Sequence, residues 1–89
     1  MGVFSLPPLV THAQANACVR DFEAHVRASD SLWTLEASAL QRFDSSALAV
    51  LLACRRLAAQ RGQTLRLVGL SPRLQSLARL YGVHELLGV

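Results

Sequence analysis

The stretch RFDSSALAVLL, residues 42–52, places an aspartate and two serines directly before a run of apolar residues. Short polar side chains followed by good helix formers are typical of a helix start. We therefore predict a helix from about residue 46 to residue 61, closed by Gly62. Ser45 or Ser46 is expected to accept a hydrogen bond from a free backbone amide, a cap worth ~1 kcal/mol.

Three short apolar stretches around this helix predict strands. They are residues 3–6, stopped by Pro7 and Pro8, residues 32–37, and residues 64–70. The second stretch is apolar enough to predict a strand covered on both faces.

Two further helices are expected between and after these strands. Thr11 and Gln14 fit a capping box for a helix that fades near residues 28–30. Ser71 and Pro72 open a helix that ends at Gly82, and residues 83–87 form a final turn. The predicted core stripe of this helix is Leu74, Leu77, Ala78 and Tyr81. Alternating strands and helices with short connections predict one α/β domain with a mostly parallel sheet and right-handed crossovers.

Composition supports a single folded domain. The chain has 89 residues, 52% hydrophobic and 17% charged, and its net charge is +3. Residues 1–41 carry two arginines and four acids, net −2, whereas residues 42–89 carry seven arginines and two acids, net +5. The arginines are scattered and lack interleaved aromatic residues, so we expect an acidic protein partner and no nucleic acid. No stretch is suited to a signal peptide or to insertion in a bilayer, which predicts a cytoplasmic domain.

The residues that usually carry chemistry do not form a recognisable site. Cys18 and Cys54 lie 36 positions apart within apolar helical patterns, which indicates buried free thiols. The three histidines have no ligand spacing with them, so neither a metal nor another cofactor is expected. The serine pair lacks a G-x-S-x-G elbow and a nearby histidine, so a catalytic nucleophile is not expected.

The predicted central helix carries apolar residues outside the side that should face the sheet. On a helical wheel one side gathers Ala47, Val50, Leu51, Cys54, Leu57 and Ala58, and this side should face the sheet. Leu48 and Leu52 then point away from it, together with Arg55 and Arg56. Single exposed leucines are ordinary, but an apolar ridge with a charged border beside two hydroxyls is also typical of a docking surface.

A serine at a helix start is also suited to switching. A phosphate there meets the positive end of the helix dipole, so the fold tolerates it. A partner docked over the two leucines would instead meet new charge, and the interface would be lost.

The segment beginning at Asp44 resembles the Asp-Ser-Ser/Thr-Gly-Leu motif of STAS domains. The stretches GQTLRLVGL (62–70) and LQSLARLYGV (74–83) are similar to the STAS subunit of the Mla phospholipid-transport ABC complex. The similarity covers about residues 3–89, is specific from 40 to 87, and implies one STAS domain over 1–89. It implies a small, mostly parallel sheet of three or four strands without the usual first strand. The open edge would then suit a partner or a second copy, as a homodimer.

The resemblance implies a non-enzymatic subunit that binds the ATPase of an ABC transporter and supports its assembly and activity. That complex, with its permease, moves phospholipid and maintains outer-membrane lipid asymmetry, which places the chain at the cytoplasmic face of the inner membrane. The expected partner-binding residues are Asp44, Ser45, Ser46, Leu48, Leu52, Arg55 and Arg56. The alternative is an anti-sigma-factor antagonist controlled by phosphorylation of Ser45, although Ala47 stands where antagonists usually have glycine.

Overall fold

The computed structural model describes residues 2–26 and 31–88, and it confirms the alternation of strands and helices. The main sheet contains β1 (Gly2–Ser5), β3 (Leu32–Glu36) and β5 (Thr64–Val68), in that order and all parallel. A second, two-stranded parallel sheet pairs β2 (Leu9–Val10) with β4 (Arg42–Phe43). This small sheet was not predicted, because two-residue strands leave no period in the sequence.

Four helices complete the domain: α1 (His12–His25), α2 (Ser46–Gln60), α3 (Pro72–Leu80) and α4 (His84–Leu87). The predicted fading of the first helix near residues 28–30 lies outside the described residues. Within the described part of the chain, no helix is long and apolar enough to cross a membrane.

Both predicted N-terminal signals form. The Gln14 side-chain oxygen accepts from the Thr11 backbone N–H at 3.0 Å, and the Ser71 hydroxyl accepts from the Leu74 N–H at 3.1 Å. Gly62 and Gly82 follow α2 and α3 with φ of 68° and 70°, a region that favours glycine.

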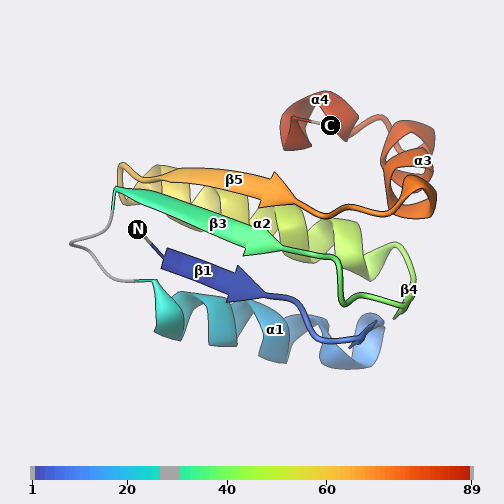
Figure 1. The fold of residues 1–89 in the computed structure, drawn as a ribbon, viewed down its shortest axis with the longest axis horizontal. Helices are drawn as coiled ribbons and strands as arrows, with labels where there is room; N and C mark the ends of the chain where they lie inside the picture. The colour runs from blue at the N-terminus through green and yellow to red at the C-terminus, as the bar shows by residue number, and fades with distance from the viewer. Residues whose placement is uncertain (1, 27–30, 89) are drawn as a thin grey trace.

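One face of the main sheet packs on helices and the other face is open. In β3 the inward side chains Trp33 and Leu35 are buried, while Leu32, Thr34 and Glu36 are partly exposed on the other face. The prediction that this strand is covered on both faces is therefore wrong. Sequential parallel strands joined by crossovers of one hand place α1 and α2 on the same face, and no described helix forms a layer over the opposite face (Figure 1).

The core lies between the sheet and the two long helices. Phe22 of α1 meets Phe4 and Trp33 edge-on, with ring centroids 5.4 and 6.5 Å apart. Cys18 and Cys54 are free and buried, as predicted. Burial raises the pKa of both thiols, that of Cys54 to about 12, so they remain protonated and act as small apolar residues.

The chain after β5 turns back over α2. Helix α4 packs against both α2 and α3, and Leu74, Ala78 and Leu87 are buried in the same core cluster as α2. Tyr81, predicted to join this core, is 57% exposed. Helix α3 ends at Leu80, so Tyr81 lies in the turn that leads to Gly82 and leaves the helical stripe.

Candidate functional site

The start of α2 is held by Asp44 and not by either serine. One Asp44 carboxylate oxygen accepts from the Ser46 N–H at 2.8 Å, and the other accepts from the His12 N–H at 3.2 Å. The bond from Ser46 is the main reason that the pKa of the Asp44 carboxyl lies below its ordinary value. Asp44 thus joins the first turns of α1 and α2, and the prediction that a serine is the cap is wrong.

This arrangement leaves Ser45 available. Its side chain is exposed and makes no hydrogen bond to any described residue. Ser46 is half-buried, and its side chain also contacts the Asp44 carboxylate. Because the aspartate satisfies the backbone, the Ser45 hydroxyl is free to meet another molecule.

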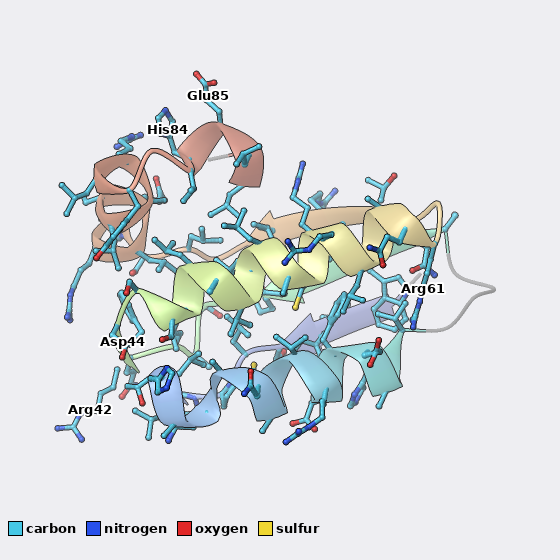
Figure 2. All side chains as sticks on the ribbon, turned by 180° about the vertical axis from the view of Figure 1, so that it is seen from behind. Arg42, Asp44, Arg61, His84 and Glu85 are labelled. Atoms are coloured by element: carbon cyan, nitrogen blue, oxygen red, sulfur yellow. The ribbon has the colours of Figure 1, made fainter. Side chains whose placement is uncertain are left out.

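Ser45 lies at the rim of a shallow hollow of about 350 Å³ between the start of α2 and α3. Its lining combines Asp44 and Ser45 with Phe43, Arg73, Ser76, Leu77 and Leu80. The guanidinium carbon of Arg73 lies 4.9 Å from the centroid of the Phe43 ring, a cation–π contact that holds the arginine beside the hollow. Figure 2 shows Asp44 and Arg42 at this end of the molecule, with Arg61 at the far end of α2.

Apolar surface at this hollow comes from α3. Leu80 is 78% exposed, and the neighbouring Tyr81 is also exposed. Neither was predicted as a surface residue. A helical wheel of α3 assigns Leu80 to the side opposite Leu74 and Ala78, so that signal was present in the sequence.

The predicted outward ridge on α2 does not exist as such. Leu48 is only 4% exposed, so the prediction that it points to solvent is wrong. Leu52 is half-buried and packs against the core cluster. The prediction from the helical wheel took the sheet as the only element packed on α2, whereas α1 and α4 also contact this helix.

The remaining predicted residues meet in a second hollow of about 370 Å³, lined by Leu52, Arg55, Arg56, Ala59 and Leu86. Arg55 donates to the backbone oxygen of Leu65 at 3.4 Å, so part of its charge is committed to β5. Arg56 and Leu86 are exposed. The structure therefore brings Asp44 and Ser45 together at one hollow, and Leu52, Arg55 and Arg56 at another, with the buried Leu48 in neither.

In the described part of the chain, the two hollows are lined by apolar, serine and arginine side chains and by one carboxylate, Asp44. Within residues 2–26 and 31–88, no three His, Cys, Asp or Glu side chains gather where a metal ion could be held. No histidine lines the hollow at Ser45, and that hollow is open to solvent. Its chemistry is that of a contact surface: a free hydroxyl, an apolar helix face and one arginine.

The fold is thus a three-stranded parallel sheet backed by helices, with an exposed serine at the start of the central helix. The family model described as "Mlab, STAS domain" matches residues 4–88, and the chain belongs to this family. STAS domains are generally regulatory or interaction domains and not catalysts.

Two solved structures share the fold. A sulfate transporter family protein from Wolinella succinogenes has a TM-score of 0.78 and 18% identity, covering 98% of this chain and 70% of that chain. The STAS domain of a SulP transporter from Vibrio cholerae has a TM-score of 0.70 and 17% identity, covering 98% and 67% respectively. No protein with a curated function matches the sequence.

Proposed function

We propose that this chain is the STAS subunit of an Mla-type ABC phospholipid transporter. It binds the cytoplasmic ATPase subunit at the inner membrane, and it supports assembly and activity of the complex that maintains outer-membrane lipid asymmetry. The family match favours the Mla branch. The observation that carries the binding role is the free Ser45 hydroxyl beside the exposed apolar end of α3.

The docking surface in this proposal differs from the one expected from sequence. Asp44 and Ser45 remain part of this surface, and Ser46 contacts the Asp44 carboxylate. Leu80 and Tyr81 replace Leu48 as the apolar anchors, since Leu48 is buried in the folded domain. Leu52, Arg55 and Arg56 form a second contact point with Leu86. Tyrosine and arginine are enriched among the residues that dominate binding at protein interfaces.

The experiment is co-purification with an Mla-type ATPase and permease after Leu80→Glu or Ser45→Trp. Fully burying a leucine at an interface contributes about 2 kcal/mol, so a glutamate there is expected to weaken binding at least ~30-fold. Val3→Glu is the matched control, because Val3 is 63% exposed but lies on the open sheet face. All three variants should stay folded by circular dichroism, and only the control should retain the ATPase. Co-purification that survives both site variants would remove Ser45 and α3 from the interface.

The alternative is an anti-sigma-factor antagonist switched by phosphorylation of Ser45. The exposed, unbonded hydroxyl favours access by a kinase, and Arg73 lines the same hollow. Mass spectrometry of the protein from its native cells distinguishes the two functions. Phosphate on Ser45 together with capture of a serine kinase supports the antagonist, whereas an unmodified Ser45 in a complex with an ATPase supports the transporter subunit.

A further inference from the structure

The second half of α2 carries a continuous stripe of residues beside α4. At positions i, i+3, i+4 and i+7 of this stripe stand Leu52, Arg55, Arg56 and Ala59. All four line the hollow of about 370 Å³, and Leu86 of α4 lines its other side. Residues at this spacing share one side of a helix. The hollow therefore follows α2 along its length, with α4 as a wall, and we call it the α2–α4 groove.

The apolar part of this groove is accessible and held in place by the core. Leu52 is half-buried and packs against the core, whereas Leu86 is 62% exposed. The next residue, Leu87, is buried, so α4 is anchored while it presents Leu86 to the groove. Ala59 is exposed, and its small side chain lets another backbone approach α2 closely. A large apolar side chain that entered between the two leucines would therefore leave water on a preformed surface.

The charges that line the α2–α4 groove are both positive. Arg56 is exposed and forms no ion pair with any described residue. The Arg55 guanidinium donates to the Leu65 carbonyl, which orders this side chain at the groove and commits one of its several N–H donors. Glu85, the acid next to Leu86, points away from α2 (Figure 2). The groove is therefore complementary to a partner that carries carboxylates beside an apolar side chain.

The backbone of such a partner segment is favoured to be helical. The groove lies between two helices, whose backbone groups are bonded within the helices, so it offers no strand edge to an extended chain. A helix satisfies its own backbone and presents side chains at the same spacing as the stripe on α2.

The page of charges and apolar residues disfavours two other occupants. In a second copy the exposed acids Asp21 and Glu23 lie on α1, but the large apolar residues of that helix pack in the core, so none is left to fill the groove. Binding to a bilayer scales with the apolar area that enters it, and Leu86 is the only exposed large apolar residue among those that line the groove.

We propose that the α2–α4 groove binds an acidic amphipathic helix of a partner protein. The helix places a large apolar side chain between Leu52 and Leu86. Its glutamates or aspartates, one turn away, lie against Arg55 and Arg56. The inference rests on the proposed function in that this helix belongs to the ATPase subunit, and it specifies the chemistry of the contact there.

The test uses the whole chain and a labelled synthetic peptide of about 20 residues, long enough to form a helix alone. One side of this helix carries leucine and glutamate, and the rest is alanine and glutamine. Fluorescence anisotropy measures its binding. The same peptide with lysine in place of glutamate should bind at least ~10-fold more weakly, and a central proline, which breaks the helix, should remove binding. Equal binding of the glutamate and lysine peptides, or full binding of the proline peptide, would overturn the proposal.

Matched protein variants locate the binding. Leu86→Ser should weaken it at least ~10-fold, because the apolar wall of the groove is lost. Arg56→Glu should weaken it at least ~5-fold, since an attraction becomes a repulsion. The controls are Leu80→Ser on α3 and Arg20→Glu on α1, exposed residues of the same types that lie outside the groove, and both should bind as the wild type does. Circular dichroism checks that each variant is folded. Unchanged binding in L86S and R56E, or equal losses in the controls, would overturn the proposal.

Two further measurements test the other occupants. Flotation with vesicles of phosphatidylcholine and phosphatidylglycerol detects binding to a bilayer, and sedimentation detects a dimer. Either one, if Leu86→Ser abolished it, would assign the groove to that occupant and overturn the proposal.

The variant Leu80→Glu separates this inference from the proposed function. It tests ATPase docking at α3 and leaves the groove intact, so peptide binding should persist where ATPase retention is lost. A wild-type chain that does not bind the peptide would overturn the inference about the groove and leave docking through Ser45 and Leu80 standing.

Discussion

Ser45, the residue before α2, and Leu48, three residues further along, meet solvent very differently. At the first turn Asp44 satisfies the backbone, and Ser45 is exposed with a free hydroxyl. One turn later Leu48 is 4% exposed, in a core that also contains Leu87 of α4. Both positions look outward when only the sheet is considered. The difference shows that an apolar residue on the far side of a helix can belong to a core that elements other than the sheet complete.

The largest expected effect separates Leu48→Ala from Leu80→Ala. Emptying a buried leucine site is expected to lower the free energy of unfolding by about 3 kcal/mol, whereas Leu80, which is 78% exposed, should change it by less than about 0.5 kcal/mol. Chemical denaturation measures both changes, provided that the free energy of unfolding depends equally steeply on denaturant concentration in the variant and the wild type. Similar small losses at the two positions would show that Leu48 is accessible in solution.

A smaller effect is expected from Leu87→Ala, which removes the buried anchor of α4. We expect a loss of about 2 kcal/mol, since a short terminal helix can relax around the cavity. The double variant with Leu48→Ala asks whether α4 covers Leu48. Contact between the sites predicts a deviation from additivity of at least ~0.5 kcal/mol in the same denaturation experiment, and simple additivity would assign the cover to other residues.

The elements of the fold were accessible from sequence because each one has a local signal. Ser71 with Pro72 and Thr11 with Gln14 mark helix starts, and alternation of strands and helices implies parallel pairing. The burial of a residue by elements that are distant in the sequence has no such local signal. That is why Leu48 was predicted to be exposed and the outer face of β3 to be covered, and both predictions were wrong. At the site, the motif located Ser45 but not its apolar neighbour Leu80, which approaches only when α3 folds back.

The next test concerns the pH dependence that Asp44 gives to the first turn of α2. Its pKa is lowered in the folded state by the Ser46 N–H, so its stabilisation is complete above the unfolded pKa and is lost as pH falls through the folded value. Asp44→Ala should therefore lower the melting temperature at neutral pH. The gap to the wild type should close under acidic conditions, as followed by thermal circular dichroism. A gap that persists at low pH would indicate a role other than capping by the charged carboxylate.

The smallest effect is expected at Ser45 itself, and it separates a functional hydroxyl from a structural one. Ser45→Ala removes no hydrogen bond between the serine side chain and the described residues, so the free energy of unfolding should stay within about 0.5 kcal/mol of the wild type. Ser71→Ala is the matched control, since its hydroxyl accepts from the Leu74 N–H and its loss should cost about 1 kcal/mol. A loss at Ser45 equal to that at Ser71 would mean that the serine caps α2 in solution. A stable S45A variant that no longer retains the ATPase would instead show that this hydroxyl acts between molecules and contributes nothing to holding the domain together.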